Sequence, residues 1–483
     1  MKCDGAGRAA AAALAAALAW SCGASADLRI GERPSAPASS PIDSASRPHT
    51  DPRLAAMTAQ ITPVVERLRG LAFLRPVAQR VCTREELLTL IERDFDEEFP
   101  PEDRATFAGM GKLLGLLPPE YDFDREIRNL MQASIAGFYD TERKELFVLE
   151  DLLDSEEARS TLAHELLHAL EDQHFNLQGI QDALEALEPN ATDRAFAFTC
   201  VAEGSAQALE EQFLFSAEAE ALSVGIDDGA PEAQPLAEEP MEVDAGGTAE
   251  ALLTQTPPIL MRMLVEPYFA GRTFLARGGG MLAPVKKSDL LVSYSAPPLS
   301  SEQIFHPEKY WDPAQRDDPQ TVVLPDLSPI LGDGWRRLGS GELGEMGAAV
   351  MTTDPEEAED EDLVPQWMLG VRSTQAAEGW DGDRYEVYQS EKGALFCVWV
   401  SVWDSEKDAL EMDEALPRPF GVEREVRRRG PVLAAAFSRQ GPKGELLGRL
   451  ADLALAQAAL RAPLPLDLRP SNSAAPAQGA VGR

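Results

Sequence analysis

Residues 161–168 have the sequence T-L-A-H-E-L-L-H, and this run constrains the fold more than any other part of the chain. His164 and His168 are four residues apart, so on a helix their imidazoles project from one face and can reach a single zinc ion. Glu165 lies between them, where it can accept a proton from a water molecule on the metal and later donate it to a leaving amine. The opposite face is apolar, so the run predicts a metal-binding helix with a buried back. That face carries Leu162, Leu166, Ala169 and Leu170.

A catalytic zinc ion usually has three protein ligands and one open position, and two residues compete for the third place. His174 follows His164 by ten residues (174 − 164), the spacing of the pattern H-E-x-x-H-x-x-G-x-x-H, but Glu171 occupies the position where that pattern has a helix-breaking glycine. Glu203 lies 35 residues after His168 (203 − 168), on a helix face that otherwise has the composition of a buried one. A buried carboxylate needs a positive partner, which zinc would supply. We therefore expect His164, His168 and Glu203 as ligands, with His174 as the alternative third ligand.

The composition limits the classes of partner. The chain has 483 residues, of which 44% are hydrophobic, enough for two or three structural units with a sizeable core. Its 81 acidic and 44 basic residues give a formal net charge of −37. Such a surface repels nucleic acid and anionic lipid, so we expect neither as a partner. No C-x-x-C motif is present, which argues against a cysteine zinc site, and we expect Cys82, Cys200 and Cys397 to be buried thiols.

The first 26 residues resemble a signal peptide. Lys2 and Arg8 form a basic segment before an Ala/Leu-rich stretch, residues 9–20, that is too short to span a bilayer. Two endings compete: L-A-W-S-C at residues 18–22 resembles a lipobox that would lipidate Cys22, and A-S-A at residues 24–26 fits an ordinary cleavage site. The Ser/Pro-rich residues 27–52 indicate a flexible tether. We expect an exported cell-envelope lipoprotein, with a secreted or periplasmic soluble protein as the alternative.

The remaining chain predicts an α+β fold that is mainly helical, with a small C-terminal α/β part. Residues 53–330 form the expected catalytic region, and residues 216–250 within it indicate a disordered acidic insertion. Residues 331–466 form the C-terminal part, and residues 467–483 are expected to be a disordered tail.

Local patterns predict the elements that hold the site. T-R-E-E at residues 83–86 is a capping box that starts a helix, and residues 134–149 predict a hairpin. Asp154 and Glu157 are expected to cap the metal-binding helix. Further helices are expected at about residues 193–215, 257–277, 405–416 and 444–461, and strands at 384–389 and 395–403.

The metal-binding run extends into a longer signature. Residues 164–175, H-E-L-L-H-A-L-E-D-Q-H-F, resemble the H-E-L-x-H-A-L-x-D-Q-H-F signature of a family of largely uncharacterised bacterial HExxH zinc-metallopeptidase-like proteins of gluzincin type. Three further segments resemble motifs of that family: A-E-G-S-A at 202–206, P-L-S-S-E-Q-I-F-H-P-E-K-Y at 298–310 and G-W-D-G-D-R-Y at 379–385. The resemblance covers about residues 136–416 and implies a zincin-like fold for the catalytic region and hydrolysis of peptide bonds. Ser205 departs from the family, where an acidic residue is common at that position.

The same segments supply candidates for supporting roles. His306 could donate a hydrogen bond to the oxyanion of a tetrahedral intermediate, or it could be a structural histidine in its turn. Tyr310 and Tyr139 are weaker candidates for the same donor. Asp172 could orient an imidazole or be a solvated helix acid. Arg384 could bind a substrate carboxylate or carbonyl, or form a salt bridge that holds its own turn.

Together these patterns predict one zinc ion per chain and hydrolysis of a peptide or protein substrate, with Glu165 as general base and then acid, assisted by His306. Two alternatives stay open: a zinc-binding envelope lipoprotein without turnover, and a metallohydrolase acting on non-peptide amides or esters. The presence of Glu165 argues against the first, because loss of that glutamate is the usual mark of an inactive site. Contact with a membrane is expected only through a lipid on Cys22.

Overall fold

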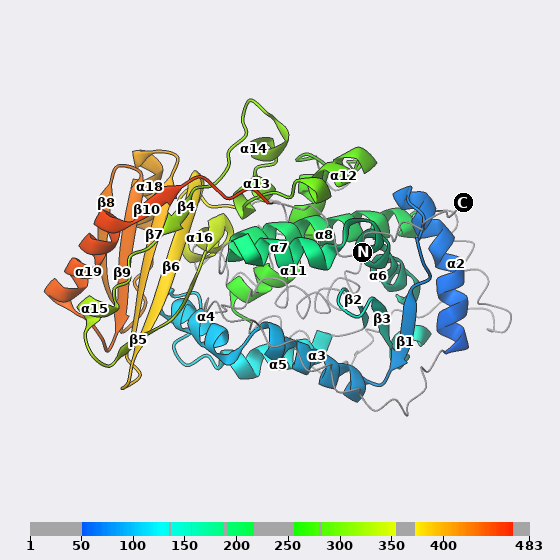
Figure 1. Cartoon of the computed structure of the whole chain (residues 1–483), viewed down its shortest axis with the longest axis horizontal. Coiled ribbons are helices and arrows are strands. Elements are labelled where there is room, and N and C mark those ends of the chain that lie inside the picture. Colours follow the sequence, from blue (N-terminus) through cyan, green and yellow to red (C-terminus); the bar gives the residue numbers. More distant parts are fainter. Residues whose placement is uncertain are drawn as a thin grey trace, which may run out of the picture.

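The computed structural model describes residues 51–134, 137–155, 157–187, 191–216, 256–279, 283–353 and 372–466. The expected signal peptide, the tether up to residue 50, the acidic insertion after Ser216 and the C-terminal tail lie outside these residues. Figure 1 shows an elongated arrangement, with an antiparallel sheet at one end and mainly helices at the other. This mixture of helices and sheets agrees with the expected α+β class. In the described part, no helix is both long and apolar enough to cross a membrane.

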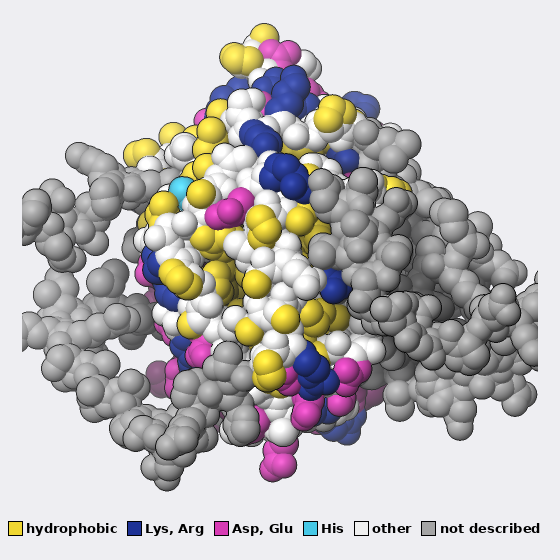
Figure 2. All heavy atoms as spheres, turned by 90° about the vertical axis from the view of Figure 1, so that its right-hand side faces the viewer, with side chains coloured by type: hydrophobic (Ala, Val, Ile, Leu, Met, Phe, Trp, Pro, Cys, Tyr) yellow, Lys and Arg dark blue, Asp and Glu magenta, His cyan; other side chains and the backbone are white. Residues whose placement is uncertain are grey.

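The first helix of the described residues, α2 (Pro52–Arg69), begins within the expected tether. The Asp51 side chain caps it by accepting a hydrogen bond from the backbone N–H of Arg53 at 2.7 Å. Beside α2 lies a groove of about 530 Å³, whose lining also includes residues 73–77, Leu146 and Leu166. Figure 2 shows hydrophobic side chains gathered in the middle of this end of the molecule. The groove lies behind the metal-binding helix, and none of the expected metal ligands lines it.

Three helices and a short strand follow α2. The capping box is confirmed, because Thr83 and Glu86 bond to each other's backbone N–H groups at the start of α3. Its presence explains why this helix start could be located from four residues alone. The elements of this region are β1 (Ala78–Cys82), α3 (Arg84–Glu98), α4 (Pro101–Leu114) and α5 (Phe123–Ser134).

A three-stranded sheet lies against the metal-binding helix. Strand β3 (Glu145–Leu149) pairs antiparallel with β2 (Gly137–Asp140) and parallel with β1. The expected hairpin is confirmed, whereas β1 was not expected from the sequence. The order β1-β3-β2 makes β2 an edge strand, and β2 packs against α6. A strand edge therefore lies next to the helix that carries the metal-binding run.

Long helices form the centre of the molecule. Helix α6 (Ala158–Phe175) carries the metal-binding run, and α8 (Thr192–Leu214) carries Glu203. The expected cap at Asp154 is wrong: this residue ends a 3-10 turn, η1 (Glu150–Asp154), and its carboxylate pairs with Arg53 at 2.9 Å. The other helices here are α7 (Leu177–Leu187) and α11 (Pro258–Leu275).

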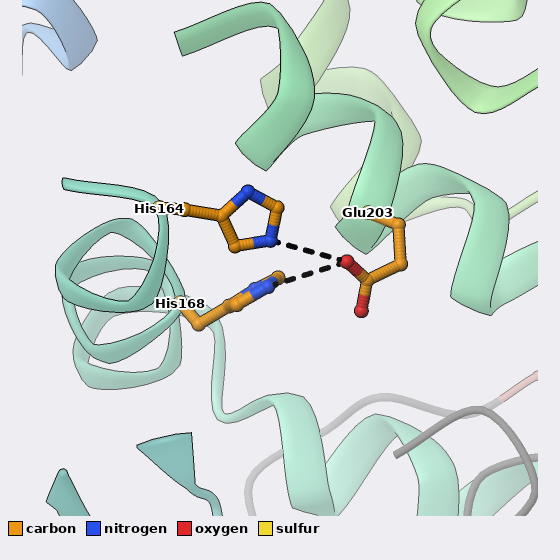
Figure 3. A group of neighbouring side chains, drawn as sticks. All are labelled: His164, His168 and Glu203. Carbon is orange, nitrogen blue, oxygen red and sulfur yellow. Dashed lines mark hydrogen bonds and ion pairs between the residues drawn. The ribbon is translucent and has the colours of Figure 1, made fainter. Parts of the chain in front are cut away.

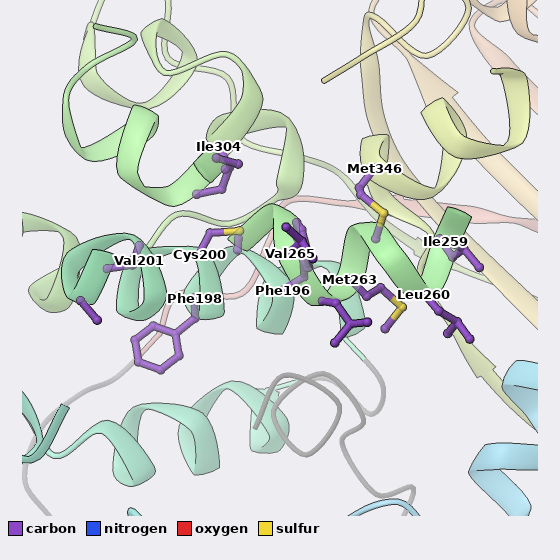
Figure 4. Packing of buried hydrophobic residues seen from close by; sticks show 14 of the residues in the cluster. Phe196, Phe198, Cys200, Val201, Ile259, Leu260, Met263, Val265, Ile304 and Met346 are labelled. Carbon is purple, nitrogen blue, oxygen red and sulfur yellow. The ribbon is translucent and has the colours of Figure 1, made fainter. Parts of the chain in front are cut away.

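Helices α8 and α11 cross at two glycines. Figure 4 shows the apolar side chains that both helices bury along this contact. A Cβ atom on Gly271 would lie 1.7 Å from the backbone oxygen of Cys200, and one on Gly204 would lie 2.2 Å from the backbone carbon of Gly271. The two backbones therefore touch directly, which only glycine permits. This crossing determines where side chains one turn away on α11 meet α8.

The C-terminal part contains a five-stranded antiparallel sheet of order β5-β6-β7-β9-β8. One face packs against α19 and the other against α18 and α4. Side chains of β7 alternate accordingly: Phe396 joins the cluster under α19, whereas Trp399 joins the main core. One face of the sheet therefore contributes side chains to the main hydrophobic core, and the other face packs against α19. Its elements are β5 (Trp335–Gly341), β6 (Trp380–Ser390), β7 (Leu395–Trp403), α18 (Glu406–Ala415), β8 (Glu423–Arg429), β9 (Val432–Arg439) and α19 (Gly444–Gln457).

Short elements connect the helical centre to this sheet. The connecting elements are α12 (Lys287–Ser295), α13 (Ser301–Phe305), α14 (Glu308–Trp311), β4 (Thr321–Val323), α15 (Ser328–Leu331), α16 (Gly344–Thr352) and, after α19, β10 (Ala459–Arg461).

The three cysteines of the described residues behave as expected from the sequence. Cys82, Cys200 and Cys397 are all buried and free.

Candidate metal centre

Three side chains expected as metal ligands converge on one point. The Nε2 atoms of His164 and His168 lie 3.3 Å and 3.5 Å from Oε2 of Glu203. Figure 3 shows both imidazoles, from α6, pointing at this one carboxylate oxygen, from α8. One ligand atom from each residue lies within 4.8 Å of the other two, and all three residues are buried. The structure thus brings together residues about 40 positions apart that the sequence had linked only by their chemistry.

The donor set fits a zinc ion. Two imidazole nitrogens and one carboxylate oxygen are a ligand set found in catalytic zinc sites, where the fourth position is left open. His174, the alternative third ligand, lies elsewhere: its Nε2 atom is 2.8 Å from the backbone oxygen of Ala72. Among the described residues, the cluster of His164, His168 and Glu203 is therefore the one that matches the predicted site.

The histidines and carboxylates of the cluster shift one another's pKa values. Burial favours the neutral form of Glu203, but His168 and His164 outweigh it and hold the pKa of this carboxyl well below its usual range. Burial opposes charge on His164 as well, yet Glu203 and Glu210 raise its pKa well above the ordinary value. The neighbouring carboxylates thus favour the protonated form of the imidazoles. A metal ion would replace those protons as the positive partner of Glu203.

Glu165 lies in the same buried region, held by the edge strand. The backbone N–H of Tyr139 in β2 donates a hydrogen bond to Oε2 of Glu165 at 2.8 Å. Burial raises the pKa of Glu165, and the neighbouring His164 and His168 only partly counteract this effect. A carboxyl group with a raised pKa is suited to accept and return a proton near neutral pH.

Asp172 supports Glu165 indirectly and contacts no imidazole among its described hydrogen bonds. It accepts a hydrogen bond from the Tyr139 hydroxyl at 2.9 Å and one from the Lys144 ammonium at 2.8 Å. Both donors belong to the β2–β3 hairpin. Asp172 therefore fixes the hairpin whose backbone holds Glu165, and the Tyr139 hydroxyl is engaged there.

The remaining polar residues of the signature attach α6 to its neighbours. Glu171 is fully buried and pairs with Arg69 at 2.6 Å. It also accepts hydrogen bonds from Tyr294 at 2.6 Å and from Ser205 at 2.8 Å. Ser205, which departs from the family pattern, thus links α8 to α6, two residues after Glu203 on α8 and one turn after His168 on α6.

Tyr268 is part of the centre, although sequence reasoning missed it. Its ring centroid lies 5.8 Å from that of His164, and its hydroxyl lies near enough to Glu203 for that carboxylate to raise the pKa of the phenol. Burial, followed by the charges of Glu203 and Glu165, raises the pKa of Tyr268 well above its usual value, so the phenol stays protonated and able to donate. Tyr268 reaches this place because it lies one turn before Gly271, where α11 crosses α8.

His306 contacts a different cluster. Its Nε2 atom lies 2.9 Å from Oε1 of Glu345 in α16, and no hydrogen bond or ion pair among the described residues joins it to the metal centre. Next to it, Lys309 lies among three carboxylates, 2.5 Å from Glu302, 2.9 Å from Asp317 and 3.0 Å from Asp404. The Lys309 ammonium is thus the positive partner of these three carboxylates. These contacts fit the structural alternative for His306, and its role in catalysis stays a prediction.

The His306–Glu345 pair predicts a pH dependence of stability. Burial lowers the pKa of His306, but Glu345 outweighs it and raises the pKa above 6.5. This contribution to the free energy of unfolding is fully present below the ordinary pKa and is lost as pH rises through the folded-state value. The stability difference between wild type and His306→Gln, measured by urea unfolding between about pH 6 and pH 9, should therefore shrink as pH rises. A difference that is constant over this range would contradict the pairing.

Arg384 also fits its structural alternative. One guanidinium nitrogen donates to the Ser340 hydroxyl at 3.0 Å, and another lies 3.7 Å from Glu342. Its neighbour Asp383, overlooked in the sequence, is buried and accepts hydrogen bonds from four donors at the junction of β6, β7 and α16. Burial raises the pKa of Asp383, and these donors oppose the rise. The donors are the backbone N–H groups of Leu343 and Gly344 and the indoles of Trp380 and Trp399.

Comparison with known proteins gives a match only outside the metal centre. Residues 334–433 match a family described as a domain of unknown function (DUF8575). This segment contains β5 to β8 and the beginning of β9, so it corresponds to most of the C-terminal sheet. No curated protein and no solved structure matches the chain.

Proposed function

We propose that this protein is a zinc-dependent metallopeptidase with a zincin-like catalytic region of gluzincin type. The observation that carries the proposal is the convergence of His164, His168 and Glu203, with Glu165 beside them. A zinc ion held by these ligands would act as a Lewis acid on water and on the scissile carbonyl. One zinc ion per chain is expected, and the substrate is a peptide or protein.

Glu165 performs the proton transfers in this mechanism. Its carboxylate accepts a proton from the attacking water, and the same group then donates that proton to the leaving nitrogen of the peptide. The backbone N–H of Tyr139 holds the carboxylate in place at 2.8 Å and leaves its other oxygen available. Water is limited around the group, because the glutamate is 8% exposed.

Tyr268 and the edge strand act on the substrate. The protonated phenol of Tyr268, next to Glu203 and His164, donates a hydrogen bond to the oxyanion that develops as the carbonyl is attacked. This assigns to Tyr268 the role that His306 was expected to have. Strand β2 is an edge strand of the three-stranded sheet in the described part of the chain, and an extended peptide can add to a strand edge through backbone hydrogen bonds. The substrate backbone would then run past Glu165.

Metal analysis together with peptide cleavage tests the proposal. The full chain should contain about one zinc per molecule and cleave members of a peptide library, and a chelator should abolish cleavage until zinc is restored. Glu203→Ala should weaken zinc binding by more than the roughly 10–100-fold that loss of a supporting partner causes. His174→Ala, the matched control, should keep the metal.

Three results would contradict the proposal in different ways. A wild-type chain that stays metal-free in excess zinc would exclude the metal centre. Full zinc occupancy without cleavage of any peptide would favour a zinc-binding protein without turnover. Cleavage confined to non-peptide amides or esters would favour a different metallohydrolase.

A further inference from the structure

Helix α8 brings a second carboxylate to the metal centre. Glu210 follows Glu203 by seven residues, which is two helical turns, so both side chains lie on the same face of α8. Oε2 of Glu210 lies 3.4 Å from Nδ1 of His164, and the Glu210 side chain is 14% exposed. The carboxylate is therefore held between the two helices.

The imidazole of His164 is thus placed between two carboxylates of one helix. Glu203 faces its Nε2 atom and Glu210 faces its Nδ1 atom. The Nδ1 atom is shielded from solvent and makes no regular hydrogen bond with a described residue; Oε2 of Glu210, at 3.4 Å, is its ion-pair partner. The buried Nδ1 atom of His168 also lacks a hydrogen bond, but no carboxylate of the described residues forms an ion pair with it. The arrangement therefore distinguishes the two histidines.

We propose that Glu210 is a positioning residue that orients His164 for metal binding; this inference rests on the proposed function. A histidine that binds a metal through Nε2 keeps its remaining proton on Nδ1, and a partner for that proton fixes both the tautomer and the ring orientation. Glu210 is that partner. It makes no contact with substrate in this role, and it acts on the metal through His164.

The adjacent residue, Glu211, provides a matched control. Its carboxylate pairs with Arg272 of α11 at 2.9 Å and takes no part in the centre. Glu210 and Glu211 have the same side chain, lie on the same helix turn and are both largely buried. Comparing variants at Glu210 and Glu211 therefore separates the effect of removing a largely buried carboxylate from the effect of removing the contact with His164.

Zinc affinity of the full chain, measured by competition with a chelating indicator, tests the inference. Glu210→Ala should weaken zinc binding about 10–100-fold, and Glu210→Gln less, because the amide oxygen still accepts from Nδ1–H. Glu211→Gln should leave zinc affinity within about twofold, although its thermal stability falls. Circular dichroism of each metal-free variant verifies folding, and Glu210→Gln preserves the test if Glu210→Ala does not fold.

The outcomes separate this inference from the proposed function. Wild-type affinity in both Glu210 variants would overturn the role of Glu210 and leave the zinc centre intact. An equal loss in Glu210→Gln and Glu211→Gln would overturn it as well, since a general packing effect would then explain both. A wild-type chain that binds no zinc would overturn both proposals.

Discussion

Replacing Glu165 by glutamine should lower kcat/KM for peptide hydrolysis by roughly 10²–10⁴-fold while zinc stays bound. The amide oxygen can still accept the hydrogen bond that the Tyr139 backbone N–H now donates at 2.8 Å. It cannot accept a proton, however, so the water loses its base and the leaving nitrogen loses its acid. His164, His168 and Glu203 are unchanged in this variant, which is why metal content should be retained.

Steady-state cleavage of a fluorogenic peptide and elemental analysis of the same samples check this prediction. Glu157→Gln is a matched control, because Glu157 precedes α6 and its side chain makes no capping hydrogen bond. It should have wild-type activity. Wild-type turnover in Glu165→Gln would exclude Glu165 as the general base. Loss of zinc together with activity would mean that the glutamate supports metal binding instead.

The parts of the site that depend on local spacing could be predicted from the sequence. Two histidines one turn apart need only a helix to lie side by side, and α6 provides it. Glu203 could be found because a carboxylate on a buried helix face requires a cation. Glu210 carried a usable signal as well, since a second glutamate two turns from Glu203 must lie on the same face.

Tyr268 could not be predicted in this way. Its position depends on the angle and distance at which α11 crosses α8, and these are determined by the contact of Gly204 with Gly271. A glycine inside a helix gives no periodic sequence pattern that indicates which other helix it will contact. His306 shows the opposite case. Its motif identified it as a candidate, but its partner Glu345 lies 39 residues away, and this contact places His306 in a different cluster from the metal ligands.

The overlooked strands have a similar explanation. Strand β1 pairs with β3, more than 60 residues later, so its pairing leaves no local trace. Strand β9 contains Ala434, Ala435 and Ala436, and alanine is depleted in strands. It forms a strand here because it lies between β7 and β8, and the small side chains fit beneath α19 on one face and against the main core on the other.

Replacing Gly271 by alanine should destabilise the protein by about 3–5 kcal/mol. The added Cβ would lie 1.7 Å from the backbone oxygen of Cys200, and a backbone atom cannot move aside as the end of a flexible side chain can. The higher helix propensity of alanine, worth about 1 kcal/mol, offsets only part of this effect. Helices α8 and α11 would have to separate.

Separation of α8 from α11 should also change the geometry of the metal centre. Tyr268 lies one turn before Gly271, so its hydroxyl would be displaced from Glu203, and its contribution to the oxyanion would fall. We therefore expect Gly271→Ala to combine a lower free energy of unfolding with a reduced kcat in the protein that stays folded. A stabilising effect of bound zinc, measured as the shift in Tm on adding the metal, should persist because the ligands on α6 and α8 are unchanged.

Gly448→Ala is the matched control for this substitution. Gly448 also lies inside a helix, α19, but its added Cβ would meet the guanidinium end of Arg427 at 2.6 Å, which can move away. Its stability should stay within about 1 kcal/mol of wild type. Urea unfolding of the three proteins measures the difference. If Gly271→Ala were as stable as Gly448→Ala, the direct backbone contact between α8 and α11 would be wrong, and the position assigned to Tyr268 would lose its structural basis.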